Sequence, residues 1–428
     1  MKKICVVGLG YIGLPTATVL ADSGHTVVGV DTNEATVATV NKGKIHIAEP
    51  HLEEKVAAMV QAGRLRATTV PEEADVFIIT VPTPITAEKK ADLSYVKSAA
   101  KSIAPYLRKG NLVILESTVP PRTTVDVLLP LLLTGGLTAD DLLVAFCPER
   151  VLPGKILTEL VQNSRVIGGI DAASAEAAKE VYASFVKGEL FLTDATTAEM
   201  TKLMENTYRD VNIALANEFA LIAERVGVNV WEAIRYANMH PRVNILQPGP
   251  GVGGHCIAVD PWFIVEQADG LARLIETARL INDGMPQQVI ARIRELTEGV
   301  GKPKIALLGL TYKPNVDDCR ESPAVKIAML LRELGYTVAA HDPLAKKQDI
   351  VPLEAALQQA DLTVLLVNHD AFNSLDPRQL ARLVRRRVVL DTRGVLDRAR
   401  WEAAGFAVAV LGEGPLPCAG EDAVYKIS

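Results

Sequence analysis

A glycine-rich segment at residues 248–260, PGPGVGGHCIAVD, places Cys256 behind four glycines. Because glycine has no Cβ, such a backbone can close tightly around a ligand. If Cys256 stands at the start of the following helix, the amide donors there favour its thiolate, which is the nucleophilic form. An isolated cysteine is more commonly a buried structural residue beside a turn. The segment therefore leaves two alternatives open, and a nucleophilic role needs support from the rest of the chain.

The motif GLGYIG spaces Gly8, Gly10 and Gly13 as GxGxxG directly after an apolar run at residues 4–7. The next apolar run ends at Asp31. In this context the glycines admit a pyrophosphate at the start of a helix, and the aspartate accepts hydrogen bonds from ribose hydroxyls. Because Asp31 repels a 2′-phosphate, the motif predicts NAD rather than NADP as the cofactor. The alternative is that the glycines only allow a tight helix crossing.

Lys202, Asn206 and Arg209 recur at i, i+4 and i+7 in a helix predicted at residues 198–226, so they share one helix face. An ammonium group near a reacting alcohol stabilises a developing alkoxide, and a neutral amine accepts its proton. This function requires that the face meets the Cys256 segment. Taken alone, the spacing is most simply explained by a solvated helix face, and it cannot decide between the two functions.

Three further segments follow predicted strands, where open α/β sheets place ligand residues. In FCPERVLPG, residues 146–154, Glu149 is a candidate to orient or deprotonate water, and Arg150 is a candidate to contact an anion. Thr83 in VPTP and Thr118 in LEST end strands on the expected cofactor side. The alternatives are a surface turn pinned by prolines and threonines that cap helices.

Short apolar strands alternate with helical stretches up to residue 190, fade between residues 195 and 290, and resume after residue 301. The pattern predicts an α/β fold with two Rossmann-like, doubly wound parallel-sheet domains joined by a central helical region. We expect an NAD-binding domain at 1–194, a central helical and dimerisation domain with the cysteine segment at 195–298, and a second Rossmann-like domain at 299–428. The expected strands beyond residue 31 are 76–81, 112–115, 142–145, 165–170, 304–308, 337–341, 362–367, 388–391 and 407–411.

The two α/β halves open similarly, with KICVVGLGYI near residue 1 and KIALLGLTYK near residue 310. In each half the next strand ends in an aspartate, Asp31 or Asp342. The second copy lacks the phosphate-binding glycines. We therefore expect it to share the fold and to bind a different ligand.

Composition narrows the classes of function. The chain has 428 residues, 49% of them hydrophobic and 22% charged, which suits a globular protein with substantial cores. A net charge of −6 gives no global field that attracts nucleic acid or an anionic membrane, so we expect neither as a partner. The apolar N-terminal run is interpreted as a strand and helix rather than a signal peptide, and no window is suited to span a bilayer.

The five cysteines are an odd number, lie far apart and form no CxxC pair, which argues against disulfides and zinc and favours a reducing cytoplasm. His255 beside Cys256 lacks a second cluster with metal-ligand spacing, so we expect no metal site. The cysteines are Cys5, Cys147, Cys256, Cys319 and Cys418.

Taken together, the motifs resemble the UDP-glucose/GDP-mannose dehydrogenase family over nearly the whole chain and in the expected order. The resemblance rests on GLGYIGLP, VPTP, EST, FCPER, the lysine helix, GGHC and the segment YKPNVDDCRESP at residues 312–323. Within the family, HIAEP at residues 46–50, PERVLPG and HPRVNILQPGPGVGGHCIAVDPWFI are most similar to the branch that acts on UDP-N-acetyl-D-mannosamine. Pro153 stands where the UDP-glucose branch has a second glutamate, which fits a hexosamine substrate better.

The resemblance implies that the C6 alcohol of a UDP-N-acetylhexosamine is oxidised twice, with NAD as the cofactor, through a thiohemiacetal and a thioester on Cys256. It implies that Lys202 is the acid, base and oxyanion-stabilising residue, that Asn206 and Asp260 support the site, and that Glu149 assists water. The implied cofactor residues are Gly8, Gly10, Tyr11, Ile12, Gly13, Asp31, Thr83, Thr118 and Arg320.

The resemblance also implies a set of substrate-binding residues whose cationic members suit a diphosphate. In related enzymes the arginine matching Arg242 reaches in from a neighbouring subunit, so a homodimer with shared active sites is implied. The substrate-binding residues are Arg150, Val151, Lys202, Asn206, Arg209, His240, Arg242, Gly253, Tyr312, Lys313 and Arg393.

Other functions remain open from the sequence. Within the family, UDP-N-acetylglucosamine or UDP-glucose are alternative substrates. A two-electron hydroxyacid dehydrogenase has a similar NAD domain but needs no nucleophilic cysteine. A non-catalytic sensor of NAD or of a nucleotide sugar can share the fold, because fold alone does not establish activity.

Overall fold

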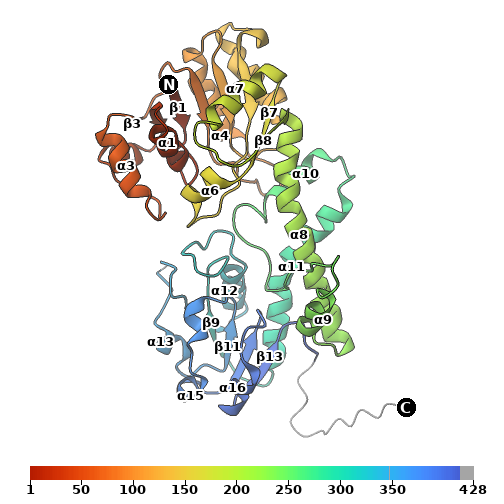
Figure 1. Ribbon diagram of the computed structural model, residues 1–428. Coiled ribbons are helices and arrows are strands. Elements are labelled where there is room, and N and C mark those ends of the chain that lie inside the picture. Colours follow the sequence, from red (N-terminus) through yellow and green to blue (C-terminus); the bar gives the residue numbers. More distant parts are fainter. Residues whose placement is uncertain (347, 415–428) are drawn as a thin grey trace. The chain divides into compact units, whose positions relative to one another are not determined.

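The computed structural model describes residues 1–346 and 348–414. Cys418 and the end of the expected C-terminal domain, residues 415–428, lie outside this part. The chain divides into two compact units (Figure 1). Unit 1 comprises Met1–Glu205 and Trp262–Leu271, and unit 2 comprises Asn206–Pro261 and the chain from Ala272 onward.

Unit 1 contains an eight-stranded sheet with the strand order β3-β2-β1-β4-β5-β6-β7-β8. The first six strands are parallel and follow the dinucleotide-binding order, while β7 pairs antiparallel with β6. The predicted doubly wound parallel sheet is thus confirmed, with one antiparallel pairing added. The strands are β1 (Lys3–Val7), β2 (Thr26–Val30), β3 (Leu65–Thr68), β4 (Val76–Ile79), β5 (Leu112–Leu115), β6 (Leu143–Phe146), β7 (Arg165–Gly169) and β8 (Leu190–Asp194).

Hydrophobic cores lie against both faces of this sheet. Along β1, Ile4 and Val6 belong to one core, while Cys5 and Val7 belong to the other. Successive side chains of a strand point to opposite faces, so a central strand covered on both sides must be apolar throughout. The helices of unit 1 are α1 (Gly13–Asp22), α2 (Glu34–Asn41), α3 (Leu52–Gln61), α4 (Ser94–Ile103), α5 (Leu129–Leu132), α6 (Ile156–Gln162) and α7 (Ala172–Tyr182).

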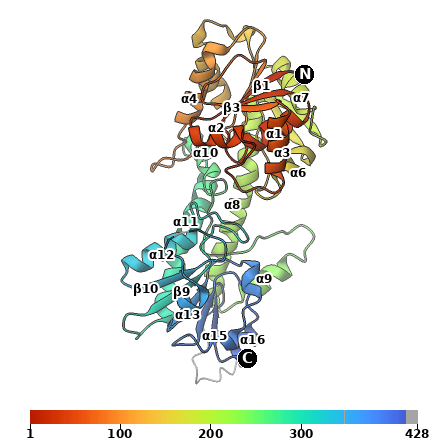
Figure 2. The same ribbon diagram turned by 90° about the vertical axis from the view of Figure 1, so that its left-hand side faces the viewer.

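Unit 2 contains a five-stranded parallel sheet with the order β10-β9-β11-β12-β13. Its strands are β9 (Lys304–Leu308), β10 (Thr337–His341), β11 (Leu362–Leu365), β12 (Val388–Asp391) and β13 (Ala407–Val410). Helices flank this sheet in Figure 2. They are α12 (Pro323–Glu333), α13 (Leu353–Leu357), α14 (Asp370–Asn373), α15 (Pro377–Leu380) and α16 (Arg398–Ala403).

The central region is helical, as expected. Its longest helix, α8 (Ala195–Val226), has 32 residues, begins in unit 1 and ends in unit 2. Within unit 2, Asn282 of α11 donates to the Asp210 side chain of α8 and accepts from Asn217, both at 2.8 Å. Asn217 also accepts from the amide of Gly249 at 2.8 Å, which ties the glycine-rich segment to α8. The other helices are α9 (Val230–Ala237), α10 (Asp260–Gln267) and α11 (Arg273–Leu296).

The sequence missed two strands, β3 and β8, which form the two edges of the sheet in unit 1. Two of the four residues in β3 are exposed or partly exposed, and every residue of β8 is at least partly exposed. Edge strands therefore lack the continuous apolar run that marks the central strands. Among the helices in the described part of the chain, none is long and apolar enough to cross a membrane.

Candidate active site

The GxGxxG turn closes tightly between β1 and α1. A Cβ added at Gly13 would lie 1.8 Å from the carbonyl oxygen of Gly8, and one added at Gly8, where φ is +97°, would lie 2.9 Å from the carbonyl oxygen of Thr80. A Cβ at Gly10 would meet no atom within 4 Å. The first and third glycines are thus required by the fold, while the second leaves its face open at the start of a helix, where a pyrophosphate binds. These residues fit NAD.

Asp31 lies beside this turn at the end of β2. Its carboxylate accepts from the amides of Leu9 and Asn33, each at 2.9 Å. A carboxylate has acceptor sites for about four hydrogen bonds, so these two leave capacity for ribose hydroxyls. Tyr11 and Ile12 belong to the same turn, between the second and third glycines.

Thr83 and Thr118, at the carboxyl ends of neighbouring strands, lie together. The Thr83 hydroxyl donates to the Thr118 carbonyl at 2.6 Å, so it joins two loops and does not cap a helix. The structure therefore places the predicted cofactor residues of unit 1 at the carboxyl ends of β1, β2, β4 and β5.

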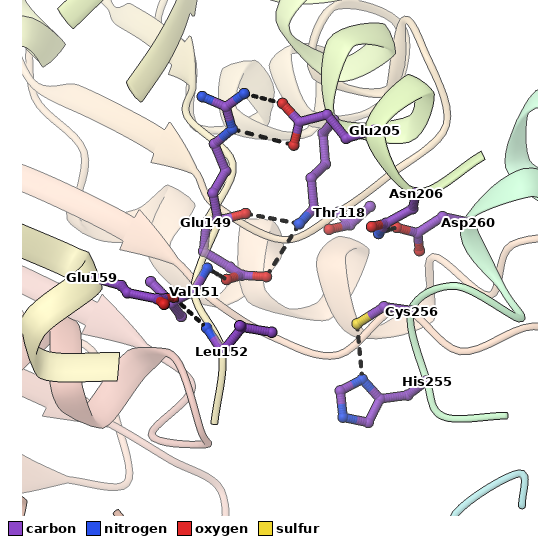
Figure 3. Close-up of polar contacts among 12 residues, drawn as sticks. Thr118, Glu149, Val151, Leu152, Glu159, Glu205, Asn206, His255, Cys256 and Asp260 are labelled. Atoms are coloured by element: carbon purple, nitrogen blue, oxygen red, sulfur yellow. Dashed lines mark hydrogen bonds and ion pairs between the residues drawn. The ribbon is translucent and has the colours of Figure 1, made fainter. Parts of the chain in front are cut away.

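Lys202 of α8 meets the segment that follows β6. Its Nζ donates to the Glu149 carbonyl at 2.8 Å and lies 3.4 Å from the Glu149 carboxylate (Figure 3). Lys202 is 6% exposed, which excludes a solvated position for it. An ammonium paired with a carboxylate in a site of low exposure suits proton transfer and stabilisation of an oxyanion.

Arg150 and Val151 are held by protein groups in the same loop. Arg150 forms an ion pair with Glu205 and donates to the Ser164 carbonyl at 3.2 Å. The amide of Val151 donates to Glu149 at 2.8 Å (Figure 3). The predicted anion contact of Arg150 would therefore compete with Glu205.

The glycines before Cys256 pack against other parts of unit 2. A Cβ at Gly253 would lie 2.5 Å from the carbonyl oxygen of Glu321, and one at Gly254, where φ is +82°, would lie 2.8 Å from the Tyr312 ring. The sequence predicted that these glycines let the backbone close tightly around a ligand. In the structure, the groups that approach them closely are Glu321 and Tyr312 of the protein itself. The predicted substrate residues Gly253 and Tyr312 lie together for this reason.

Cys256 stands one turn before α10 rather than at its first residue. Its carbonyl accepts from the amides of Val259 and Asp260 at 2.9 and 2.8 Å. Its Sγ lies 3.1 Å from Nδ1 of His255 (Figure 3). The expected position at the helix start is therefore wrong by one turn, and the group observed beside the sulfur is an imidazole, which stabilises a thiolate when protonated.

Two other cysteines are unsuited to nucleophilic chemistry. Burial raises the pKa of Cys5 to about 12 and that of Cys147 to about 11. Both are fully buried, whereas Cys256 is partly exposed. The buried structural alternative is thus excluded for Cys256.

Asn206, Arg209 and Asp260 form a chain of contacts in unit 2. Asn206 donates to Asp260 (Figure 3), and Arg209 donates to Asn206. Asn206 and Asp260 are 2% and 3% exposed, while Arg209 is exposed. The predicted supporting role of Asn206 and Asp260 remains a prediction, but the structure brings the two side chains together.

A cavity in unit 2 is lined by residues from the glycine-rich segment and from the carboxyl end of the sheet. They include Gly251, Tyr312, Lys313 and Arg393. Arg393 donates to Asn368 at 3.3 Å, and burial lowers its pKa, although Asp391 opposes this. A desolvated guanidinium beside a lysine suits a phosphate group.

A buried network behind this cavity escaped the sequence analysis. Asp342 accepts from the amides of Leu310 and Thr311 at 2.7 and 3.2 Å, and it lies 3.1 Å from His369. His369 also accepts from the amide of Asn315 at 3.0 Å. Burial alone would raise the pKa of Asp342, but the hydrogen bonds of His369 and of backbone amides hold it well below its usual range. The only feature of this network that the sequence indicated was Asp342, at the end of the second strand of the C-terminal half.

Three further predicted residues belong to unit 2. His240 and Arg242 are exposed in the turn after α9, where the amide of Arg242 donates to the His240 ring at 3.3 Å. Arg320, predicted to contact NAD, belongs to unit 2 and pairs with Asp318 at 2.7 Å. Their roles remain predictions.

A buried glutamate on α8 was also missed. Glu199 accepts from the amides of Arg122 and Thr124 at 2.6 and 2.8 Å, in the loop that follows Thr118. Burial raises its pKa to about 7, although these hydrogen bonds lower it. The helix that carries Lys202 thus also fixes a loop of the cofactor side, through a contact that joins distant residues and leaves no local sequence pattern.

We expect Asp31→Ala to weaken NAD binding by about tenfold or more, because hydrogen bonds to a charged group are lost. The preference for NAD over NADP should narrow, since a 2′-phosphate is no longer repelled. Dissociation constants of both cofactors, measured by NADH and NADPH fluorescence, check this. Asp75→Ala is the matched control, because Asp75 accepts from the amide of Lys3 at 2.8 Å at the other end of β1. Equal use of both cofactors by the wild-type protein would contradict the role.

We expect His255→Ala to slow the alkylation of Cys256 by iodoacetamide at pH 7 by about fivefold, because a neighbouring imidazolium stabilises the thiolate. The midpoint of the rate against pH should move upward. Mass spectrometry of the modified peptides reads out each cysteine separately. Cys5 and Cys147 should remain unmodified in both proteins as internal controls. An unchanged midpoint shows that His255 does not tune the sulfur.

Three stretches of the chain match the UDP-glucose/GDP-mannose dehydrogenase family. Its NAD binding domain matches residues 2–186, its central domain residues 196–284 and its UDP binding domain residues 306–398. The matched domains run in the same order as the two sheets and the helices between them.

Individual proteins are similar over nearly their whole length. A UDP-N-acetyl-D-mannosamine dehydrogenase of Methanocaldococcus jannaschii is 52% identical, covering 96% of this chain and 97% of that protein. An NDP-N-acetyl-D-galactosaminuronic acid dehydrogenase of Ralstonia nicotianae is 51% identical, covering 93% and 97%. The solved structure of a UDP-D-ManNAc dehydrogenase from Pyrococcus horikoshii matches with a TM-score of 0.90 at 43% identity, covering 96% and 99%. The chain belongs to the UDP-glucose/GDP-mannose dehydrogenase family and is an NAD-dependent dehydrogenase that oxidises a UDP-sugar.

Proposed function

We propose that the protein oxidises the C6 alcohol of UDP-N-acetyl-D-mannosamine to the carboxylate in two successive oxidations. The observation that carries the four-electron reaction is Cys256, partly exposed, beside an imidazole and on a glycine segment packed against Tyr312. A two-electron hydroxyacid dehydrogenase needs no such thiol. The cation-lined cavity near the same segment supports a nucleotide diphosphate as part of the substrate.

In the proposed mechanism, the glycine turn of Gly8, Gly10 and Gly13 together with Asp31 would hold NAD, which would supply the hydride acceptor for each oxidation. Lys202, in its neutral form, takes the proton of the C6 hydroxyl, and as an ammonium it stabilises oxygen anions. The Cys256 thiolate then bonds to the aldehyde carbon, and the oxygen takes a proton to give a thiohemiacetal. The second oxidation leaves a thioester.

Water then cleaves the thioester, the C–S bond breaks, and the thiolate is regenerated as the carboxylate leaves. Glu149 orients this water or takes its proton, and its contact with Lys202 supports this role. Asn206 and Asp260 hold the site through their mutual hydrogen bond. The sum is one alcohol and one water converted to a carboxylate, with two hydrides transferred.

Two observations favour an N-acetylhexosamine over glucose as the sugar. Pro153 stands where the UDP-glucose branch has a second glutamate, and relatives with names of two N-acetylhexosamine types are about equally similar. Purified protein with NAD and a panel of UDP-ManNAc, UDP-GlcNAc, UDP-glucose and GDP-mannose tests the choice. About two NADH per sugar fits the proposal, about one fits a simple dehydrogenase, and none fits a sensor.

We expect Cys256→Ser to stop turnover before the carboxylate forms, because a hydroxyl lacks the nucleophilicity of a thiolate near neutral pH. Folding should be little affected, since the substitution is small and the residue is partly exposed. Counting NADH and identifying the sugar product by mass spectrometry check this. Full four-electron turnover by the variant rules out the thioester mechanism.

We also propose a homodimer with shared active sites, three domains bounded as 1–194, 195–298 and 299–428, and a cytoplasmic location.

One face of α8 within unit 2 supports the homodimer, because it exposes apolar side chains at helical spacing, each exposed by 39% to 63%. The exposed position of Arg242 fits a residue that acts in the partner's site. The apolar residues are Tyr208, Leu215, Phe219, Ile222 and Val226.

We expect Arg242→Ala to raise the KM for the sugar strongly and to leave NAD binding intact, because a diphosphate loses a charged donor. Mixing Arg242→Ala with Cys256→Ser should then restore activity, since each heterodimer keeps one intact site. With random exchange of subunits, about a quarter of the wild-type activity returns. If exchange is demonstrated and no activity returns, Arg242 acts within its own subunit.

A further inference from the structure

Glu49 lies in the connection between α2 and α3 and has no role in the proposed mechanism. It is 7% exposed. Its carboxylate accepts from the amide of Gly154 at 2.7 Å and from the amide of Ile156 at 2.8 Å. Gly154 belongs to the loop that follows β6, and Ile156 is the first residue of α6 at the end of that loop, so one carboxylate fixes the end of a loop about a hundred residues away in the chain.

That loop, residues 147–155, depends on carboxylates for its shape. The amide of Val151 donates to Glu149 at 2.8 Å, and the amide of Leu152 donates to Glu159 at 2.7 Å (Figure 3). Glu149 lies within the loop, and Glu159 lies in α6 directly after it. Glu49 comes from a different part of unit 1, and therefore anchors the loop to the body of the domain.

Apolar contacts fix Glu49 and its partners on both sides. Ile47, Leu52 and Ile156 belong to the same buried core. Gly154 has φ of +89°, a conformation that favours glycine, and this turns its amide into the bond with Glu49. Removal of the carboxylate therefore leaves the amide of Gly154 and the amide of the buried Ile156 without this acceptor.

The start of the same loop carries the groups of the proposed chemistry. Glu149 contacts Lys202 through its carbonyl at 2.8 Å and through its carboxylate at 3.4 Å. Only a few residues separate this contact from Gly154, so the path of the loop sets where Glu149 stands. We propose that Glu49 is a positioning residue that holds Glu149 in register with Lys202. This inference rests on the roles proposed above for those two residues.

The test compares Glu49→Gln, which keeps one acceptor oxygen, with Glu49→Ala, which keeps none. We expect kcat with UDP-ManNAc to fall by about tenfold in the first variant and about a hundredfold in the second, because small misplacements of catalytic groups cost rate steeply. The dissociation constant of NAD should stay within about twofold, since the cofactor turn is untouched. The pH dependence of kcat should also shift, because the Glu149–Lys202 contact changes.

Asp171→Ala is the matched control for a merely structural effect. Asp171 caps α7 of the same unit by accepting from the amide of Ser174 at 2.7 Å, and α7 is a separate element from the loop at residues 147–155. It should lower Tm and leave kcat and the pH profile unchanged. Gly154→Ala is a second, independent variant, because a Cβ there meets no atom within 4 Å and only the backbone is strained. It should reproduce the loss of kcat even if the Glu49 variants fail to fold.

Two outcomes overturn the inference while the wild-type protein is active. In the first outcome, folded Glu49→Ala and Gly154→Ala both have the same kcat and the same pH profile as the wild-type protein. The other is an equal loss of kcat in Asp171→Ala, which would show that general destabilisation is the cause. If the wild-type protein releases no NADH with any UDP-sugar, the proposed function itself fails, and this result is distinct from the other two.

Discussion

Carboxylates that accept hydrogen bonds from backbone amides hold the loops at the carboxyl ends of both sheets. Asp31 fixes the amide of Leu9, and Asp342 fixes that of Leu310. Glu49 does the same for the loop after β6. A chain that leaves a strand must find partners for its amides, and a buried amide without one is costly. The loops that carry the candidate chemistry are therefore defined by a small set of acidic side chains rather than by regular structure.

The same interaction explains how two similar halves can bind different ligands. Asp31 accepts hydrogen bonds from the amides of Leu9 and Asn33 and retains capacity for a ribose. Asp342 is 5% exposed and is fully occupied by backbone amides and by His369. The second half therefore cannot use its aspartate to bind a ribose. Its cavity presents the side chains of Lys313 and Arg393 instead, which suit phosphate groups.

Much of the fold followed from the sequence, because central strands buried on both faces leave unbroken apolar runs. Expected strands at residues 112–115, 304–308 and 337–341 agree with β5, β9 and β10 at both ends. The cofactor glycines were also predictable, since their spacing is local. Glu49, Glu199 and the Asp342 network could not be predicted, because each joins residues far apart in the chain. The burial of Lys202 could not be predicted either, because helical spacing shows which residues share a helix face but does not show which part of the chain packs against that face.

The described cysteines differ in how well their surroundings suit the proposed nucleophilic role. Cys147 directly follows β6, near Glu149 in sequence, yet burial raises its pKa to about 11 and leaves it inert. Cys256 lies on a segment whose glycines let the backbone press against Tyr312. A side chain at Gly253 or Gly254 would collide with that ring or with the chain beside it, and the segment would have to move outward. The glycines therefore fix the backbone that carries the Cys256 thiol, and the thiol itself is partly exposed, as the proposed chemistry requires.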